Sequence, residues 1–159
     1  MPHSRSLLRV ARRLMSDAVA AEDLVQESLL LAWRGFHQFQ AGTNARAWLF
    51  KILFNAFHAR GRRRGANAVT VPLPDALHDQ AWNDSIALDR AAMNAALGEL
   101  PVEHRAVLLL AVVEGFTCQE IAGILAIPIG TVMSRLSRAR QALRSRLQPG
   151  AECAEREMK

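Results

Sequence analysis

The chain has 159 residues, half of them hydrophobic, which is enough for one ordinary helical domain or two small ones. The chain has 20 Lys and Arg residues against 15 Asp and Glu. A basic protein of this kind is expected to bind a nucleic acid or an acidic membrane surface. The two cysteines form no CxxC pair, which excludes a disulfide framework and a zinc site by spacing. No apolar run reaches the roughly 18 residues that span a bilayer, and the N-terminus lacks a signal core. We therefore expect a reduced, soluble, cytoplasmic protein.

Hydrophobic residues recur at helical spacing along almost the whole chain, and only the short stretch AVTVPL alternates as a strand would. The predicted fold is therefore all-α. Candidate helices cover residues 4–15, 18–37, 45–63, 85–98, 102–114, 118–126 and 131–147. Caps or breakers separate them, at Ser16-Asp17, Gly42-Thr43-Asn44, Gly115 and Pro128.

Residues 65–84 differ in composition from the rest, with two prolines, three aspartates and no basic residue. This composition is typical of a flexible linker. It predicts two small helical domains, 1–64 and 85–148, followed by a tail at 149–159. The alternative is a long loop inside one domain. The basic excess is concentrated in residues 1–64, which hold 11 basic and 4 acidic groups, and in the last helix.

The stretch Phe116-Thr117-Cys118-Gln119-Glu120-Ile121 predicts the start of a short helix. The Thr117 hydroxyl can accept from the Glu120 amide while the Glu120 carboxylate accepts from Thr117, and Phe116 and Ile121 stand where a hydrophobic staple is found. A turn around residues 127–130 and a basic helix follow. This order is typical of a helix-turn-helix, whose second helix enters the major groove of DNA.

The last helix predicts a DNA-binding face, since no acidic residue occurs between Ile121 and Ala151. Arg and Gln can contact base edges, and uncancelled positive charge attracts phosphates. A solvated charged face is the alternative. At about 100° per residue the core side holds Val132, Leu136, Ala139, Leu143 and Leu147. The opposite side holds Thr131, Ser134, Arg135, Ser137, Arg138 and Gln141, with Met133 and Arg144 on its flank, while Arg140 and Arg146 lie closer to the packing side.

The helix at 45–63 predicts a second nucleic-acid surface. Lys51, Asn55, His58 and Arg62 align at spacings of four, three and four, with Trp48 one turn before Lys51. A basic stripe with an aromatic ring at one end suits bases that stack. The alternatives are a solvated helix end with basic residues near its dipole, and a Trp48 that belongs to the core. The expected buried face holds Leu49, Ile52, Leu53, Ala56 and Phe57.

The helix at 18–37 predicts a protein-docking surface, because a polar arc with an apolar residue in its middle resembles an interface rim. Its acidic start argues against DNA. Helix-start acids favoured by the dipole, with one exposed leucine, are the alternative. The arc holds Asp23, Gln26, Glu27 and Arg34 around Leu30, and the expected core face holds Leu24, Val25, Leu29, Ala32 and Phe36.

Three stretches in order, AEDLVQESLLLAW, ARAWLFKILFN and the segment from ELPVEHRAV to SRARQAL, resemble the extracytoplasmic-function sigma factors of bacterial RNA polymerase. The resemblance covers nearly the whole chain and implies sigma regions 2 and 4. It also implies that the protein is no enzyme, needs no metal or cofactor, and has core RNA polymerase, promoter DNA and an anti-sigma factor as partners.

The resemblance also assigns roles to residues. The DLVQE helix would dock on the clamp helices of the polymerase largest subunit, through Asp23, Leu24, Gln26, Glu27 and Leu30. The next helix would open and contact the minus-ten strand, through Asn44, Lys51, Asn55 and His58, with the loop FQAGTN helping to hold a flipped base. The last helix would contact the minus-thirty-five element, through Thr131, Ser134, Ser137 and Arg138, with Arg135 and Arg140 nearer the backbone.

Two departures from the family stand out. Met133 occupies a position where members commonly carry Lys or Arg, which puts the promoter preference in doubt and allows an apolar contact to a thymine methyl. Only MPHSRS precedes LLRVARRLM, where members usually have a longer first helix. Either the start is misassigned or the first lobe lacks a turn or two of packing.

Two other functions stay open. A sigma mimic would sequester an anti-sigma factor without engaging DNA, and its recognition helix would be degraded, whereas this one keeps its arginines. A plain helix-turn-helix repressor would use the C-terminal lobe alone and would leave the DLVQE helix unexplained. An enzyme has little support, since the five histidines are scattered and no HExxH pair or glycine-rich phosphate loop occurs.

Overall fold

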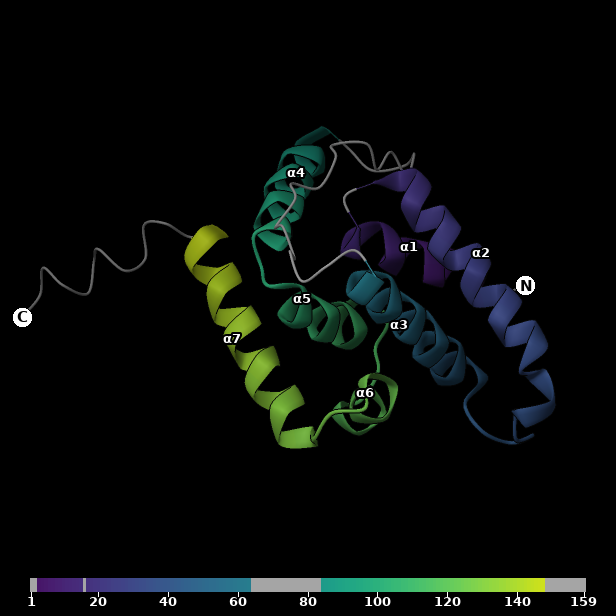
Figure 1. Ribbon diagram of the computed structural model, residues 1–159. Coiled ribbons are helices and arrows are strands. Elements are labelled where there is room, and N and C mark those ends of the chain that lie inside the picture. The colour runs from purple at the N-terminus through teal and green to yellow at the C-terminus, as the bar shows by residue number, and fades with distance from the viewer. Residues whose placement is uncertain (1–2, 16, 64–83, 148–159) are drawn as a thin grey trace, which may run out of the picture.

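The computed structural model describes residues 3–15, 17–63 and 84–147, and each element in these ranges is helical. The first lobe holds α1 (Ser4–Leu14), α2 (Ala18–Arg34), the 3-10 turn η1 (Phe36–Gln38) and α3 (Ala45–Arg63). The second lobe holds α4 (Asp84–Gly98), α5 (Val102–Leu108), the π-helical turn η2 (Leu109–Val113), α6 (Cys118–Leu125) and α7 (Ile129–Leu147). The all-α prediction is confirmed (Figure 1). The AVTVPL stretch and all but the last residue of the predicted linker lie outside the described residues.

Local chemistry sets most of the helix boundaries. The Asp17 carboxylate accepts the Val19 amide at 3.0 Å and caps α2. The predicted capping box of Thr117 and Glu120 is present at the start of α6. Gly115, at φ +69°, turns the chain between η2 and α6 in a conformation that other residues rarely adopt. The predicted helices are therefore found within a few residues of their expected ends.

The first lobe packs α1 on α2 and α2 on α3. Residues spaced three or four apart on α1, namely Leu7, Val10 and Leu14, are buried in its core. One expectation was wrong: Phe36 does not belong to the core, and 65% of it is exposed. The reason is that α2 ends at Arg34, so the 3-10 turn carries Phe36 away from the buried side of the helix.

The second lobe packs α7 against α4, α5 and α6. Val132, Leu136 and Ala139 of α7 are buried as predicted, while Leu147 at the helix end is 38% exposed and so was wrongly assigned to the core. Arg105 of α5 is buried, and its Nη2 donates to the carbonyls of Gly98 at 2.6 Å and Leu100 at 2.9 Å. Burial lowers the pKa of this guanidinium.

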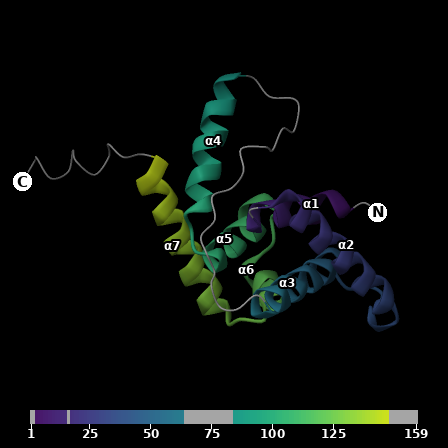
Figure 2. The ribbon, with the colours of Figure 1, turned by 45° about the horizontal axis from the view of Figure 1, so that its top comes forward.

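The two lobes pack against each other through α3, which contacts α6, while α1 contacts α5. Phe50 and Phe54 of α3 are completely buried, and the Phe50 ring meets the Phe116 ring edge to face with centroids 5.4 Å apart. The predicted buried face of α3 included Leu53 and Ala56 correctly but missed these two phenylalanines. As a result, α2 and α7 lie on opposite sides of the molecule, with α3, α5 and α6 between them (Figures 1 and 2).

Taken singly, none of the helices in the described ranges is both long and apolar enough to cross a membrane. By length and composition, α6 and α7 meet that requirement only as a pair, across a bend of 107°.

Candidate nucleic-acid interface

The helix-turn-helix is formed by α6 and α7. Ala126 ends α6 in the left-handed region at φ +54°. Pro128 then precedes α7, which begins at Ile129, two residues before the predicted start. The bend of 107° between the two helices lies within the range typical of this motif. The turn therefore presents the first turns of α7 to solvent, as a recognition helix requires.

The solvent side of α7 carries the side chains predicted to contact DNA. Met133 is 56% exposed and Ile129, one turn earlier, is 40% exposed, so two apolar groups lie at the N-terminal end of this face. Thr131 is half-buried, and the Ser134 hydroxyl donates to the Thr131 carbonyl at 3.1 Å. Four more residues predicted on this side are exposed, namely Ser134, Ser137, Arg138 and Gln141, and so is Arg140, which was predicted closer to the packing side.

Two arginines of α7 are paired within the second lobe. Nη2 of Arg135 lies 2.6 Å from the Glu103 carboxylate of α5, so this predicted DNA contact is engaged in the present arrangement. Nε of Arg146 lies 2.6 Å from the Glu99 carboxylate, which confirms that Arg146 lies on the packing side of the helix. Arg138 and Arg146 therefore form a useful contrast between the two sides of one helix.

On α3, the predicted stripe of Lys51, Asn55, His58 and Arg62 is exposed. Trp48 is half-buried, and its ring lies 5.2 Å from that of Phe39, which in turn stacks on Phe36 at 6.0 Å. These three aromatic rings form a partly exposed platform beside the basic stripe. Such a platform can stack on unpaired bases.

Asn44 has two structural contacts in addition to its predicted role. Its side-chain oxygen accepts the Ala47 amide at 3.1 Å and caps α3, and its Nδ2 donates to the Glu120 carboxylate of the second lobe at 2.9 Å. The pKa of Glu120 lies below its ordinary value, mainly because the backbone and hydroxyl of Thr117 donate to its carboxylate. Asn44 therefore joins the two lobes in this structure.

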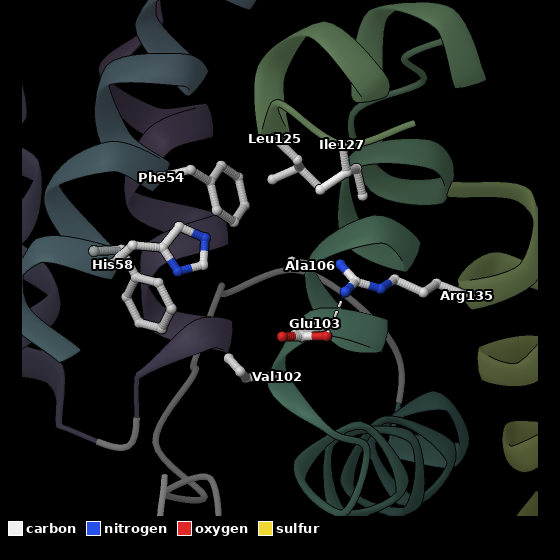
Figure 3. A pocket seen from close by; sticks show the side chains of 9 residues that line it. Phe54, His58, Val102, Glu103, Ala106, Leu125, Ile127 and Arg135 are labelled. Carbon is white, nitrogen blue, oxygen red and sulfur yellow. Dashed lines mark ion pairs between the residues drawn. The ribbon is translucent and has the colours of Figure 1, made fainter. Parts of the chain in front are cut away.

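His58 lines a pocket of about 140 Å³ between the lobes (Figure 3). Its pKa lies below the ordinary value, first because of burial and then because of the positive charges of Arg62 and Arg135, while Glu103 acts in the opposite direction. A neutral imidazole is thus favoured when the lobes are together. The pocket is lined by Phe54, Phe57 and His58 from the first lobe and by Val102, Glu103, Ala106, Leu125, Ile127 and Arg135 from the second.

The arc on α2 is largely exposed, as predicted for a protein-docking surface. Asp23, Gln26 and Arg34 are exposed, and Leu30 in the middle of the arc is 50% exposed. Glu27 is paired with Arg60 of α3, at 2.7 Å from both its Nε and its Nη2. Asp23, Gln26, Arg34 and Leu30 are therefore available to a partner. Glu27 is available only if it breaks its ion pair with Arg60.

One residue that the resemblance assigned to docking is not on the surface, and two residues of the arc were missed. Leu24 is completely buried in the first lobe, as its place on the expected core face predicts, so its side chain is not available to polymerase. Val19 and Trp33 are 66% and 76% exposed, and at about 100° per residue they fall on the same arc as Leu30. The spacing of Val19 and Trp33 from Leu30 in the sequence could have indicated that they belong to the arc. Trp33 is an aromatic residue of the kind enriched at interface centres.

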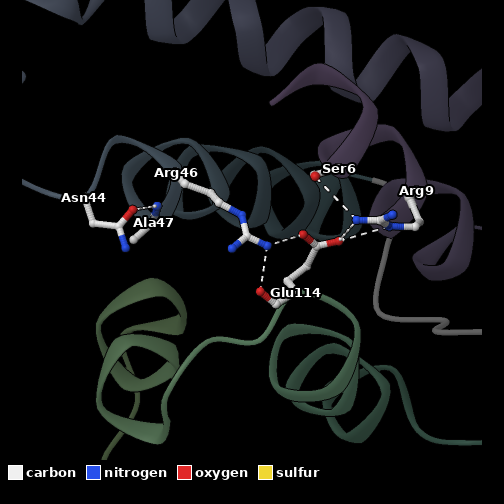
Figure 4. Close-up of polar contacts among 6 residues, drawn as sticks. All are labelled: Ser6, Arg9, Asn44, Arg46, Ala47 and Glu114. Carbon is white, nitrogen blue, oxygen red and sulfur yellow. Dashed lines mark hydrogen bonds and ion pairs between the residues drawn. The ribbon is translucent and has the colours of Figure 1, made fainter. Parts of the chain in front are cut away.

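Glu114 was also missed by the sequence analysis. It follows the π-helical turn η2, and its side chain is completely buried between Arg9 of α1 and Arg46 of α3 (Figure 4). We call these three residues the Glu114 cluster. The sequence gives no local signal for it, since an acidic residue before Gly115 is typical of an exposed helix end.

Taken together, the fold and these surfaces define a helix-turn-helix DNA-binding protein with a second helical lobe. Family models match both lobes: Sigma-70 region 2 matches residues 1–66, and Sigma-70, region 4 matches residues 90–143. The ECF RNA polymerase sigma factor SigL of Mycobacterium tuberculosis is 41% identical over 152 residues, which cover 92% of this chain and 85% of SigL. The chain belongs to the extracytoplasmic-function family of RNA polymerase sigma factors.

Two further comparisons bear on length and on the arrangement of the lobes. The ECF RNA polymerase sigma factor SigE of Mycolicibacterium smegmatis is 37% identical over 153 residues, which cover 91% of this chain but 58% of SigE. This chain therefore spans little more than half the length of that relative. The sigma factor RpoE of Bartonella quintana, solved in complex with the anti-sigma factor NepR, superposes with a TM-score of 0.78 at 35% identity over 91% of both chains.

Proposed function

We propose that the protein binds core RNA polymerase and directs it to particular promoters. The observation that carries this is the presence of two separate exposed surfaces on one sigma-family chain. One is the acid-free solvent face of α7, and the other is the arc on α2 with Leu30 in its middle. A repressor that used the second lobe alone would leave the α2 arc without a role.

The DNA half of the function is divided between the lobes. The solvent face of α7 contacts the minus-thirty-five element, with Ser134, Ser137, Arg138 and Gln141 toward base edges and phosphates. The α3 stripe and the Phe36, Phe39 and Trp48 rings contact the unpaired minus-ten strand. Support for this comes from the exposure of Lys51, Asn55 and Arg62 beside those rings and from the general preference of unpaired bases for aromatic stacking.

The α2 arc is the polymerase-docking surface. It starts with the acidic Asp23, has the apolar Leu30 in its middle and ends with Arg34 and the exposed Trp33. This mixture suits a protein partner, because interface centres are apolar and aromatic with a polar rim. It lies on the opposite side of the molecule from α7, so polymerase and the minus-thirty-five DNA do not compete for one face (Figures 1 and 2).

An anti-sigma factor controls the protein. The RpoE of Bartonella quintana was solved with the anti-sigma factor NepR, and this chain superposes on it over both lobes. A partner that contacts both lobes of this arrangement would keep them together and withhold the α3 and α7 surfaces from a promoter at the same time.

Polymerase binding is tested with a pair of leucines. Leu30 is 50% exposed within the arc, and Leu31 is 42% exposed outside it. Leu30→Asp should weaken binding to core polymerase by at least about tenfold, as expected for an interface centre, while Leu31→Asp should change it little. Both variants are titrated against core polymerase by fluorescence anisotropy. Equal effects of the two substitutions would show that the α2 arc is not the docking surface.

Promoter-directed initiation is tested by run-off transcription on a genomic fragment library with the chain and core polymerase. Transcripts that start downstream of a common sequence are the expected result. Tight binding to an anti-sigma factor, together with no polymerase affinity, would instead identify a sigma mimic. Operator binding by the second lobe without a polymerase complex would identify a repressor.

A further inference from the structure

The Glu114 cluster joins the two lobes through a buried charge. The Glu114 side chain is fully buried, with one carboxylate oxygen 2.9 Å from Nη2 and 3.2 Å from Nε of Arg9. Nη2 of Arg46 contacts the other oxygen and also donates to the Glu114 backbone carbonyl at 2.7 Å. Both arginines belong to the first lobe and Glu114 to the second. The ion pairs therefore exist only while the lobes are in contact (Figure 4).

Aromatic rings surround this charged contact. The Arg46 guanidinium lies 4.5 Å from the centroid of the Phe116 ring and 5.9 Å from that of Phe50, and the two rings are packed edge to face. The rings hold the Arg46 guanidinium in place, and the fully buried carboxylate attracts its arginines more strongly than it would in water, which raises the cost of losing one of them.

Further contacts between the lobes extend on either side of the cluster. Arg105 of the second lobe donates to the Arg13 carbonyl of the first at 3.2 Å, and Asn44 donates to Glu120 at 2.9 Å. The interface therefore runs from α1, past the Glu114 cluster, to the start of α6. It engages Asn44 and partly covers His58, both predicted to contact the minus-ten strand.

A buried carboxylate is costly unless it is paired. Every hydrogen bond to the Glu114 carboxylate within the described ranges comes from the first lobe. The second lobe alone would leave this group to water, and the first lobe without Glu114 would leave two arginines close together. Pairing across the interface satisfies all three groups at once. The cluster therefore favours the arrangement in which the two lobes are in contact, which we call the closed arrangement.

The closed arrangement cannot engage a whole promoter, if the proposed function is correct. The minus-ten and minus-thirty-five elements are about 25 base pairs apart, or about 85 Å at 3.4 Å per base pair. A compact chain of this length has a radius of gyration of about 15 Å. With Phe50 of α3 in ring contact with Phe116 beside α6, the two DNA surfaces cannot reach both elements. The lobes must separate before initiation.

We propose that the Glu114 cluster is an autoinhibitory contact that holds the free protein closed without any partner. A promoter that must contact both lobes then binds only the fraction of molecules whose lobes have separated, so its apparent affinity is lowered by that fraction, while the exposed α2 arc stays open to polymerase. A partner that binds both lobes gains from the same contact, because it meets an arrangement that the chain already favours. This proposal rests on the proposed function only where it concerns polymerase and promoter.

The first test measures the arrangement of the lobes in the full chain alone. Glu114→Ala and Arg46→Ala remove the contact from opposite lobes, and Arg146→Ala is the matched control, because it breaks an ion pair that lies within the second lobe. Small-angle X-ray scattering should show a larger radius of gyration for the two cluster variants and an unchanged one for the control. Circular dichroism should show that all three keep their helices. Unchanged scattering of both cluster variants would overturn the proposal.

A rescue experiment separates the ion pairs from general damage to the interface. Replacing a buried ion pair by apolar groups of similar volume is often neutral or stabilising. The triple variant Arg9→Met, Arg46→Met, Glu114→Leu should therefore return to the compact scattering profile. A triple variant as expanded as Glu114→Ala would show that closure needs the charges themselves, whereas a compact one would show that the single substitution opens the lobes by leaving two arginines unpaired.

The last test is functional, and it distinguishes a failure of the autoinhibition from a failure of the proposed function. In a titration of a promoter duplex with core polymerase and the chain, Glu114→Ala should form promoter complexes at an about fivefold lower concentration than the natural chain. An expanded Glu114→Ala that forms promoter complexes no better than the natural chain would overturn the autoinhibition. If neither chain binds polymerase, the proposed function fails, while the scattering result still decides whether the cluster closes the free protein.

Discussion

α3 and α7 are the two helices proposed to contact DNA, and the molecule holds them in different ways. α7 buries Val132, Leu136 and Ala139 within its own lobe and leaves most of its other side exposed. α3 buries one side in its own lobe and a second side, with Phe50 and Phe54, toward the other lobe. Separation of the lobes would therefore change the surroundings of α3 much more than those of α7.

Both proposed DNA surfaces are exposed with the lobes together, but only the one on α3 also contacts the other lobe. Arg138, Arg140 and Gln141 of α7 face solvent with the lobes together. Just before α3, Asn44 is bonded to Glu120, and on α3 the exposed His58 lines the pocket between the lobes. Separation of the lobes would therefore free Asn44 and His58 from these contacts and leave the proposed minus-thirty-five surface as it is.

The largest expected effect comes from the ring contact between the lobes. Phe50→Ala removes a fully buried ring that packs on Phe116, and should lower the free energy of unfolding by about 3–5 kcal/mol. Val132→Ala in the core of α7 is the comparison and should cost less, since it removes a smaller buried side chain. Urea denaturation followed by circular dichroism gives both values. An unfolding midpoint that Phe50→Ala leaves unchanged would mean that the second buried side of α3 contributes nothing to stability.

The next effect separates the two sides of α7. Arg138→Ala should weaken binding to minus-thirty-five duplex DNA and reduce the slope of log K against log salt by about one, since one phosphate contact is lost. Arg146→Ala should leave that slope unchanged, because Arg146 is paired with Glu99 on the packing side. Fluorescence anisotropy at several salt concentrations measures both slopes. Equal slopes for the two variants would show that Arg138 contacts no phosphate, so that it either contacts a base or does not contact the DNA.

A smaller effect concerns Met133. An exposed methionine on a recognition helix can contact the C5-methyl group of thymine. Replacing thymines of the minus-thirty-five element singly by uracil, which lacks that methyl group, should weaken binding about fourfold at one position. Met133→Ala should bind the thymine and uracil duplexes equally. If the natural chain already binds every uracil duplex as well as the thymine one, Met133 has no such contact.

The smallest effect is a dependence of lobe separation on pH. The pKa of His58 is lowered by burial and by Arg62 of its own helix, and the second lobe adds the lowering charge of Arg135 and the opposing charge of Glu103, so only the burial against that lobe and these last two charges change when the lobes separate. Protonation therefore favours separated lobes, so the contribution of His58 to closure is complete above its ordinary pKa of about 6.5 and declines as the pH falls below it. Scattering between pH 7.5 and 5.5 should show expansion, and His58→Gln should reduce that change. A natural chain and a variant that expand equally would exclude His58 as the cause.

Much of the secondary structure could be predicted because its signals are local. Asp17 caps α2, Thr117 and Glu120 form the capping box of α6, and Gly115 turns the chain, each through contacts within a few residues. The face of α7 could also be predicted, because this helix has only one apolar side and its partners lie in the same lobe. Phe36 was misplaced because the helical pattern continued past the residue where α2 stops hydrogen bonding as an α-helix.

The sequence by itself therefore determined the helices, the turn of the helix-turn-helix and the exposed sides of α2 and α7, because each depends on neighbours in the chain or on one repeated spacing. Only the tertiary structure decided which sides of α3 are buried and whether Glu114 is buried. α3 is apolar on more than one side, so periodicity could not say which phenylalanines face the other lobe. Glu114 lies 105 residues from Arg9 and 68 from Arg46 along the chain, and no local pattern links residues so far apart. Their contact exists because the packing of the lobes removes a carboxylate from water and supplies the charges that it then requires.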